Sequence, residues 1–591
     1  MSHAKPASTA LSYSDIFAEV ASQESHAASF KDVVRVLVLR NITVEGLDTY
    51  LKHALYQRGI RAELAFGGYG TMVQDTLADD GLVATFGADL IVLAITLDEL
   101  APTYGAPGWR RDQAQADLMQ LLELLTQRSR ATIAVHTFIT PSVRELGLVT
   151  DPHGHDLASQ VSDLNRAVID FVRSHAPQCF LVDWDRELRR LGEDAALDRR
   201  GAYLWKSPFK RPFLQAWATQ LSNAVFALKG RSKKCLVLDC DNTLWGGVIG
   251  EDGLDGIQLD GHSYPGKAFV DFQTSVLHLV ERGVLVTLCS KNNEADVFEV
   301  LDGHPWSRLK RSHLSGWRIN WDDKASNIAA LAVELNLGLD SFVFVDDNPV
   351  ECGLVAQLLP QVTVIQVPKK LHELPPILLD SGLFDTLSLT SEDRQRATLY
   401  QSESQRKSAL GDFGSMDDYL RSLETVALIH PAHATELPRI AQLTQKTNQF
   451  NLTTRRYSQP EIEALAADPA ADVYSLTVRD RYGPLGLVGA LIVRRADGVA
   501  SIDTFLMSCR ALGRRLEQAM IEHCLADVSS NHPLSHWRAE YRPSAKNAQV
   551  ADFWPRVGFE LTHEVDGQRH YAWHAGSPSA GPTPHVTIEK D

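Results

Sequence analysis

The chain has 591 residues, of which 44% are hydrophobic and 22% are charged, as in ordinary soluble globular proteins. This length exceeds what one hydrophobic core serves, so we expect about three domains. The formal net charge of -16 argues against nonspecific nucleic-acid binding. The polar start resembles no signal peptide, no window approaches a membrane span, and seven irregularly spaced cysteines indicate a reducing, cytoplasmic setting without disulfides or zinc.

Residues 1–228 predict a first α/β domain. Short β-rich apolar runs alternate there with helix-length amphipathic stretches, which is typical of a parallel sheet. The pattern resembles the SGNH-hydrolase fold, but Arg40-Asn41 stands where that family's nucleophilic serine follows the first strand. We therefore expect a noncatalytic domain used for docking or dimerisation. The predicted strands are Val33–Leu39, Leu90–Ile95, Thr132–Val135 and Phe180–Val182.

The second predicted domain begins with a buried strand run that ends in two acids. Asp239 and Asp241 flank Cys240, and a hydroxyl follows at Thr243. Ligands of open α/β sheets collect beyond the carboxyl ends of parallel strands, where one Asp can act as a nucleophile while its neighbour transfers protons. This arrangement suits a metal and a phosphate. A solvated acidic turn is the alternative, since short acidic patterns recur by chance.

Three later segments repeat this plan at successive predicted strand ends. One apolar run ends at Ser290, Lys324 opens a predicted helix, and another apolar run ends in Asp346 and Asp347. Ser290 could hydrogen-bond a phosphoryl oxygen, and Lys324 could neutralise transferred negative charge. Each segment alone has an ordinary explanation as a cap, a surface lysine or a turn. The order acid pair, hydroxyl, lysine, acid pair is much harder to explain in that way.

With these motifs, residues 229–370 resemble the phosphotransferase core of the haloacid dehalogenase superfamily. The resemblance implies that Asp239 attacks phosphorus, that Asp241 protonates the leaving group and then activates water, and that Lys324 stabilises the transition state. It also implies Mg²⁺ as the cofactor, with Asp347 as a direct ligand and Asp346 orienting the lysine. The full implied set is Asp239, Asp241 (through its carbonyl), Asp346 and Asp347 for the metal, and Thr243, Ser290 and Asn292 for the substrate.

The superfamily inserts cap domains in two intervals, and both are short in this chain. The first holds a glycine-rich flap over 246–259 and one predicted helix, Lys267–Arg282. The second, Asn293–Asn320, has room for little more than a helix and a strand. The core is therefore expected to be uncapped, so that it admits a large substrate or is closed by another domain of the chain.

A connector is expected over 371–416, with a polar helix from Ser391 to about Ser408. The tail over 576–591 is rich in turn residues, which predicts disorder.

Between connector and tail, residues 417–575 predict a third domain of the α+β class. The strand run 500–508 leads through a turn with Arg510 and Gly513 into a helix from Leu516. A glycine- and arginine-bearing turn before a helix favours a pyrophosphate. The segment resembles the GNAT acyltransferase signature, although Arg515 stands where a small residue belongs.

Cys509, at the end of that strand run, is the residue that could connect phosphate removal with acyl transfer. Its thiol could accept an acyl group beside a phosphopantetheine cradle and pass it to a carrier-protein thiol. The alternative is a small buried cysteine that packs as a hydrophobe. Cys240 is a second candidate, but its side chain is expected to point away from the metal because neighbours in an extended segment alternate.

The whole architecture resembles the FkbH-like family. Beside the motifs above, the segment 446–456 (Lys-Thr-Asn-Gln-Phe-Asn-Leu-Thr-Thr-Arg-Arg) matches that family alone. A polar helix-to-loop turn with solvated Arg455 and Arg456 is the structural alternative for this segment.

The resemblance implies an enzyme that dephosphorylates 1,3-bisphosphoglycerate and loads the glyceryl group onto the phosphopantetheine thiol of an acyl carrier protein in polyketide-type biosynthesis. Two alternatives remain: a Mg²⁺-dependent phosphatase acting on a small phosphorylated metabolite, and a noncatalytic scaffold that docks carrier proteins. No nucleic-acid or membrane partner is expected, and the oligomeric state is left open.

Overall fold

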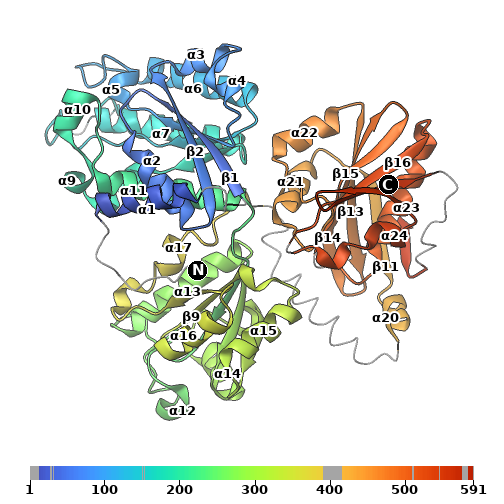
Figure 1. Ribbon diagram of the computed structural model, residues 1–591. Helices are drawn as coiled ribbons and strands as arrows, with labels where there is room; N and C mark the ends of the chain where they lie inside the picture. Colours follow the sequence, from blue (N-terminus) through green and yellow to red (C-terminus); the bar gives the residue numbers. More distant parts are fainter. Residues whose placement is uncertain are drawn as a thin grey trace. The chain divides into compact units, whose positions relative to one another are not determined.

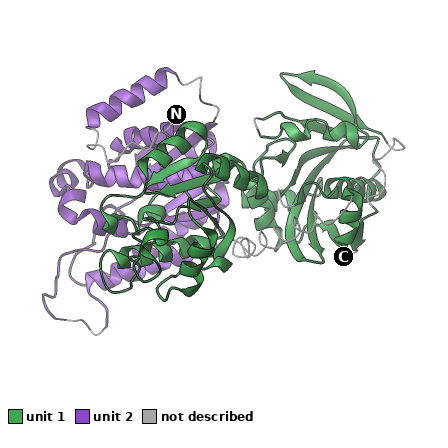
Figure 2. Cartoon of the chain, turned by 90° about the horizontal axis from the view of Figure 1, so that it is seen from below, with its two compact units in different colours: residues 1, 230–384, 389–591 green, residues 2–229, 385–388 purple. Residues whose placement is uncertain are grey.

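The structure is a computed structural model that describes residues 12–26, 30, 32–149, 151, 153–389, 415–508, 511–544, 546–574 and 584–589. The chain divides into two compact units (Figure 2). One unit comprises residues 2–229 and 385–388, and the other comprises Met1, 230–384 and 389–591. The described residues contain no helix that is both long enough and apolar enough to cross a membrane.

The unit of residues 2–229 and 385–388 is built on a parallel five-stranded sheet in the order β2-β1-β3-β4-β5, drawn in blue to teal in Figure 1. Apolar residues on both faces of the sheet form two cores under the helices. The four predicted strands are confirmed, and β2 is an additional strand. The strands are β1 (Asp32–Arg40), β2 (Ile60–Tyr69), β3 (Leu90–Ala94), β4 (Thr132–His136) and β5 (Cys179–Val182). The main helices are α1 (Tyr13–Ser25), α2 (Gly46–Tyr56), α6 (Asp112–Arg128), α7 (Leu157–Ser174), α8 (Trp184–Leu191) and α11 (Arg211–Leu228), with shorter ones at α3 (Met72–Leu77), α4 (Leu82–Thr85), α5 (Leu97–Leu100), α9 (Glu193–Ala196) and α10 (Arg199–Trp205).

Polar residues at the carboxyl edge of this first sheet hydrogen-bond or stack within the domain. The Asn41 side chain bonds both backbone groups of Thr96, at 2.9 and 3.1 Å. His136 stacks on Trp184 with ring centroids 3.4 Å apart, and burial lowers its pKa to about 3. A neutral, fully packed histidine of this kind holds the fold, and the noncatalytic assignment of the domain stays a prediction.

In the other unit, residues 235–366 form a parallel five-stranded sheet in the order β10-β9-β6-β7-β8. Its three inner strands are buried along their whole length, as expected where helices cover a parallel sheet. The strands are β6 (Cys235–Leu238), β7 (Leu285–Ser290), β8 (Leu314–Ile319), β9 (Phe342–Asp346) and β10 (Thr363–Gln366). The helices are α12 (Ile249–Asp252), α13 (Gly266–Glu281), α14 (Glu294–Gly303), α15 (Lys324–Glu334) and α16 (Pro349–Leu358), with single 3₁₀ turns at η2 (Arg311–His313) and η3 (Leu339–Ser341).

This core extends further along the chain than the sequence indicated. Residues 371–384 carry η4 (Leu371–Glu373) and α17 (Ile377–Asp380), and Leu374, Leu378 and Phe384 are buried in the same cluster as the strands. Apolar side chains spaced along this segment bury against the sheet, so the segment belongs to the core and not to a connector. The polar helix predicted from Ser391 lies outside the described residues.

The third domain is a mixed nine-stranded sheet in the order β17-β18-β16-β15-β14-β13-β11-β19, with β12 paired to β15. Strand β19 (Val586–Glu589) pairs with β11 (Thr425–Pro431), so the disorder predicted for the tail is wrong at these residues, where edge pairing outweighs the turn-rich composition before it. The other strands are β12 (Phe450–Asn451), β13 (Ala471–Asp480), β14 (Gly483–Ala496), β15 (Val499–Met507), β16 (His536–Tyr541), β17 (Glu560–Val565) and β18 (Gln568–Trp573). The helices are α20 (Met416–Ser422), α21 (Leu437–Lys446), α22 (Gln459–Ala467), α23 (Leu516–Asn531) and α24 (Phe553–Arg556), with a 3₁₀ turn at η6 (Ala548–Val550).

Candidate active site

Three of the predicted site residues meet at one edge of the core sheet. Asp239 directly follows β6, whose last residue pairs with Val345 of β9 on one side and Leu288 of β7 on the other. This register brings Asp239 level with Asp346 at the end of β9 and with Cys289, the neighbour of Ser290, at the end of β7. The Asp239 amide donates to the Val345 carbonyl at 3.0 Å, which fixes the turn that carries the acid.

Lys324 lies between two of these carboxylates. Its Nζ is 2.9 Å from Asp239 Oδ1 and 2.6 Å from Asp346 Oδ2, and only 5% of its side chain is exposed. The lysine is the first residue of α15, whose N-cap Asp323 accepts a hydrogen bond from the Ser326 amide. Burial alone would lower the pKa of Lys324, but the two carboxylates raise it above its usual range, so the ammonium stays charged.

The acids at this edge are held in a poorly solvated, negatively charged environment. Burial, opposed by Lys324 and assisted by Asp346, raises the pKa of Asp239 to about 6. Burial and the neighbouring Asp346 also raise the pKa of Asp347. Carboxylates in this state gain from a bound cation, because a cation replaces the water that burial removed.

A cluster of oxygens suited to Mg²⁺ follows from this arrangement. Single carboxylate oxygens of Asp239, Asp346 and Asp347 all lie within 4.8 Å of one another. Mg²⁺ prefers oxygen ligands and is commonly held by one or two carboxylates together with water. Both oxygens of Asp346 already accept hydrogen bonds, from Lys324 and from the Asn348 amide at 2.8 Å. The residues therefore fit the ion, and this contact pattern favours Asp347 over Asp346 as a direct ligand.

The side chain of Asp241 is fixed by three donors. Its Oδ1 accepts from the Trp245 indole at 2.9 Å and from the Ile249 amide at 3.1 Å, and its Oδ2 accepts from Asn292 Nδ2 at 2.9 Å. The same Asn292 nitrogen also donates to Ser290 Oγ at 3.2 Å. Both hydrogens of this nitrogen are thus used inside the protein, so the substrate-binding role expected for Asn292 does not follow from its position.

The two predicted phosphate-binding hydroxyls are both buried. Ser290 lies beside the Asp239 carboxylate, where its hydroxyl counteracts the rise in the pKa of Asp239, and it is 2% exposed. The hydroxyl of Thr243 is fully buried and has no hydrogen-bond partner within the described part of the chain. An orphaned buried hydroxyl is costly to leave unpaired, so a phosphoryl oxygen that entered the site would satisfy it. The phosphate-binding role of both residues stays a prediction.

The cysteines near the acids are packed and unreactive. Cys240 is fully buried, and burial raises the pKa of its thiol well above the usual value. Burial likewise raises the pKa of the Cys289 thiol to about 12. Six cysteines lie in the described ranges, and all are buried free thiols. A thiol must ionise to act as a nucleophile, so the structure does not favour Cys240 as an acyl carrier.

No inserted domain covers this site between Asp239 and Asp347, a stretch that the structure describes in full. The first interval contains α12 and a return of the chain in which Gly246 pairs with Gln258, followed by α13. The second contains α14, η2 and β8. Both intervals match the short insertions expected from the sequence.

In the third domain, β15 and β16 pair only over their first three residues and then diverge. The chain fills the resulting opening with its own segment. Phe450 and Asn451 of β12 pair with the end of β15, and the Leu452 backbone bonds Phe505 on one side and Arg542 on the other, at 3.2 and 2.8 Å. The end of β15 and the Arg542 amide just after β16 are therefore already hydrogen-bonded to this segment.

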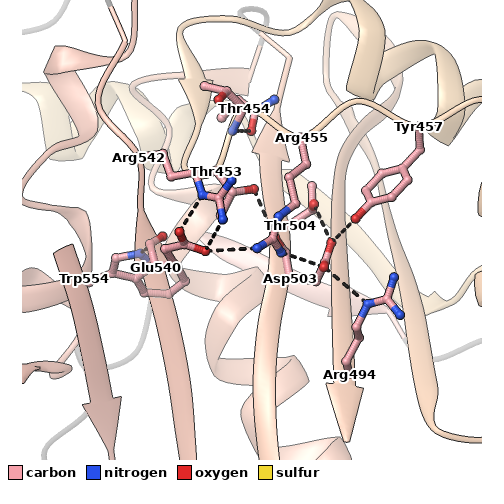
Figure 3. A network of polar contacts seen from close by, with 11 residues as sticks. Thr453, Thr454, Arg455, Tyr457, Arg494, Asp503, Thr504, Glu540, Arg542 and Trp554 are labelled. Carbon is pink, nitrogen blue, oxygen red and sulfur yellow. Dashed lines mark hydrogen bonds and ion pairs between the residues drawn. The ribbon is translucent and has the colours of Figure 1, made fainter. Parts of the chain in front are cut away.

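Figure 3 shows the polar network that fastens this segment. Arg455 donates to Asp503 of β15 at 2.6 Å and to Glu540 of β16 at 3.0 Å, and Tyr457 donates to Asp503 at 2.6 Å. Arg456 bonds Asn448 at 2.8 Å. The alternative of a solvated arginine is therefore wrong for Arg455, whose guanidinium bonds two carboxylates, whereas Arg456 is exposed.

The predicted pyrophosphate turn is described in part. Gly513 has a φ of 79°, a conformation that glycine adopts readily, and α23 begins three residues later. Arg514 is buried against Asp480 at 2.9 Å, so this cation is already paired. Cys509 and Arg510 lie outside the described residues.

No protein-family model matches the chain, and no curated protein sequence matches it. Among solved structures, the N-terminal part of the protein BF1531 from Bacteroides fragilis, which contains a phosphatase domain complexed with Mg, is 25% identical with a TM-score of 0.58. That match covers 64% of this chain and 100% of the other.

Two acetyltransferases match with TM-scores of 0.21, each over 26% of this chain. They are the ribosomal-protein-S18-alanine N-acetyltransferase of Escherichia coli, 15% identical over 96% of its length, and NAA60 of Arabidopsis thaliana, 14% identical over 99%. TM-scores this low carry no structural argument, so the third domain is described by its own strand order alone. The expected fold class is confirmed as an α/β multidomain chain with two parallel five-stranded sheets and a mixed sheet.

Proposed function

We propose that the protein removes phosphate from 1,3-bisphosphoglycerate with its Asp239 centre and loads the glyceryl group onto the phosphopantetheine thiol of an acyl carrier protein. The observation that carries the proposal is Lys324, buried between Asp239 and Asp346 at 2.9 and 2.6 Å. A nucleophilic carboxylate, a fixed cation and an oxygen-rich metal cluster are what phosphoryl transfer requires. The likeness to a phosphatase domain complexed with Mg supports this half of the proposal.

The core acts on the phosphate monoester in two steps. An oxygen of Asp239 forms a bond to phosphorus while the bond from phosphorus to the leaving oxygen breaks, and Asp241 gives that oxygen its proton. A water then attacks the aspartyl-phosphate, Asp241 takes a proton from the water, and inorganic phosphate departs with Asp239 restored. Lys324 balances the charge on the transferred group in both steps.

Asp239, Asp347 and the Asp241 carbonyl would hold Mg²⁺, which would supply positive charge at the transferred phosphoryl group. The chain's own contribution is to hold the nucleophile, the lysine and the acid in place and to keep the site dry. These residues come from the ends of neighbouring strands and from the start of α15, which are rigid elements of the sheet.

The acyl phosphate reacts differently, because it is already activated toward a thiol. The thiol sulfur attacks the carbonyl carbon, a carbon–sulfur bond forms, the carbon–oxygen bond breaks, and phosphate leaves with the electron pair. The thiol is that of the carrier protein or, in a relay, that of Cys509. In sum, bisphosphoglycerate, carrier thiol and water give a glyceryl thioester and two phosphates.

The uncapped core supports a substrate shared with a partner protein. No inserted domain lies between Asp239 and Asp347 to seal the site around a small metabolite. The proposal of glyceryl transfer, and of a carrier protein as partner, rests on the FkbH-like motifs and above all on the segment 446–456.

The test is to incubate the protein with Mg²⁺, 1,3-bisphosphoglycerate and a phosphopantetheinylated carrier protein, and to weigh the carrier by mass spectrometry. A glyceryl mass increase that disappears with Asp239→Asn supports the proposal. Phosphate release at the same rate without any carrier, and without an adduct when the carrier is present, would instead identify a small-molecule phosphatase.

A further inference from the structure

We propose that Trp245 and Asn292 are positioning residues that orient Asp241, so that its Oδ2 is the oxygen that transfers the proton to the leaving group. The inference rests on the proposed phosphate chemistry and assigns roles within it to two residues. The observation behind it is that three donors surround the Asp241 carboxylate in an unequal way, two on Oδ1 and one on Oδ2.

Asp241 needs such support because its backbone provides little. It sits in the turn after β6, half-buried, next to Asn242, which has a φ of 52°. A carboxyl group on a turn is free to rotate about its side-chain bonds unless contacts hold it. General acid catalysis depends on the orientation of the proton toward the leaving oxygen, so freedom of this kind lowers the rate.

Trp245 supplies a fixed donor. Its side chain is fully buried, and its indole N–H points at Asp241 Oδ1 at 2.9 Å. A buried indole N–H requires a partner, and a bulky ring packed on all sides cannot turn away. The Ile249 amide is the second donor to the same oxygen, at 3.1 Å. Oδ1 is therefore held on two sides as an acceptor.

Asn292 supplies the third donor from a different strand end. It lies two residues beyond Ser290, is 6% exposed, and spans Ser290 Oγ and Asp241 Oδ2 with one nitrogen. This amide couples the acid to the hydroxyl that lies against Asp239. Asn292 thus links the acid Asp241 to Ser290 across β6 and β7.

The unequal donors select one oxygen for the proton. A carboxylate has about four lone-pair positions, two on each oxygen. The two positions on Oδ1 accept from Trp245 and Ile249, and one position on Oδ2 accepts from Asn292. Within the described part of the chain, the remaining position on Oδ2 is the one where a proton does not displace an existing donor.

The competing assignment is the one drawn from the sequence, in which Asn292 binds the phosphoryl group. The two assignments predict different kinetics. A phosphate ligand acts on every phosphate ester and changes KM. A positioning residue for the acid changes kcat, and it does so mainly when the leaving oxygen is strongly basic and needs the proton.

The experiment compares Trp245→Phe and Asn292→Ala with the wild type on two substrates, glycerol 3-phosphate and p-nitrophenyl phosphate, with Mg²⁺ present. The first substrate releases a strongly basic alkoxide and the second a weakly basic phenolate. We expect kcat on the glycerol ester to fall about tenfold more than on the aryl ester, with KM little changed. Trp317→Phe and Asn293→Ala, in the same core but without contact to Asp241, are the matched controls and should leave the ratio of the two rates unchanged.

Equal losses on both substrates, or losses confined to KM, would overturn the inference. A readout that does not depend on activity is hydrogen exchange of the Trp245 indole N–H in protein labelled with ¹⁵N-tryptophan. Slow exchange that Asp241→Ala accelerates supports the contact, and unchanged exchange contradicts it. If the wild type hydrolyses neither ester while the indole is protected, the proposed function fails and the positioning contact stands.

Discussion

The Nζ of Lys324 lies 2.9 Å from Oδ1 of Asp239, with only 5% and 8% of the two side chains exposed. A pair this deeply buried costs desolvation on both sides and is stable only while both partners are present. Asp346, on the other side of the lysine, makes the group a triad of one cation and two anions. The triad of Lys324, Asp239 and Asp346 therefore has an excess of negative charge.

Replacing the lysine should damage both activity and stability. Lys324→Met leaves two buried carboxylates without a cation, and we expect a loss of about 3 kcal/mol in the free energy of unfolding together with near-complete loss of phosphate release. Urea denaturation and a phosphate assay measure the two effects. The control is Lys267→Met, because the Lys267–Asp271 pair is half-exposed and should contribute less than about 1 kcal/mol. Equal losses in the two variants would contradict the buried triad.

Mg²⁺ should stabilise the folded protein through the same acids. Binding to the folded state alone adds free energy that grows with the ratio of free ion to Kd, so the melting temperature should rise with Mg²⁺ concentration. Asp347→Asn should remove most of that rise. The exposed Asp322, replaced by Asn, should leave the rise intact. A wild-type melting temperature that is the same with EDTA and with millimolar Mg²⁺ would speak against the metal cluster.

The raised pKa of Asp239 should make the stability of the folded protein depend on pH. Its pKa is about 6 in the folded state against an ordinary value of 3.8, so between these values the folded state binds a proton that the unfolded state lacks. Without metal, this group's contribution makes the protein more stable as pH falls from 6 toward 4, and it is constant below that window.

Metal binding should show the opposite trend in the same window. A protonated Asp239 must lose its proton before it binds the ion, so the apparent affinity for Mg²⁺ should fall by about tenfold for each unit below pH 6. Titration calorimetry of the wild type and of Asp239→Asn isolates this group. Parallel pH profiles in the two proteins would show that another group is responsible.

The site residues at the strand ends could be predicted from sequence because they depend on local order. Asp239, Ser290 and Asp346 each end an apolar run, and parallel strands place such ends at one edge. The contact between Asn292 and Asp241 could not be predicted in this way, because it joins residues 51 positions apart and depends on the register of β6 against β7 and on the direction of one amide. The hydrogen bond that the Trp245 indole donates could not be predicted either, because a hydrophobic pattern indicates only that the ring is buried.

The third domain shows the same limit. The strand before Cys509 and the helix after it are local patterns and were found, with β15 and α23 close to the expected bounds. The pairing of β19 with β11 and the role of Arg455 are long-range contacts. Nothing near Arg455 in the sequence points to Asp503 or to Glu540.

Arg455 should be a stability determinant of the third domain. Its guanidinium joins Asp503 on β15 to Glu540 on β16, whose side chains are 8% and 13% exposed. Arg455→Gln should lower the free energy of unfolding by about 2 kcal/mol, because each carboxylate loses one charged donor while Arg494 stays on Asp503 and Arg542 stays on Glu540. Arg569→Gln is the control, since its pair with Glu564 is about half-exposed. A loss no larger than that of the control would mean that Arg455 is merely a surface residue.

The two candidate cysteines should behave differently toward alkylation and loading. Cys240 is fully buried with a raised pKa, so iodoacetamide should not modify it in the folded protein. Under the relay form of the proposal, Cys509→Ala abolishes glyceryl loading while phosphate release from a monoester continues. Undiminished loading by Cys509→Ala would assign acyl capture to the carrier thiol directly. Peptide mass spectrometry after labelling reports both residues.

The most direct test of the account is to trap the phosphorylated enzyme. The protein is mixed with its phosphoryl donor and Mg²⁺, quenched in acid, reduced with borohydride and digested, so that a phosphorylated aspartate is converted to homoserine and read by mass spectrometry. The account predicts homoserine at position 239 in the wild type and none in Asp239→Asn. Steady phosphate release without modification of Asp239, or modification at another carboxylate, would contradict it.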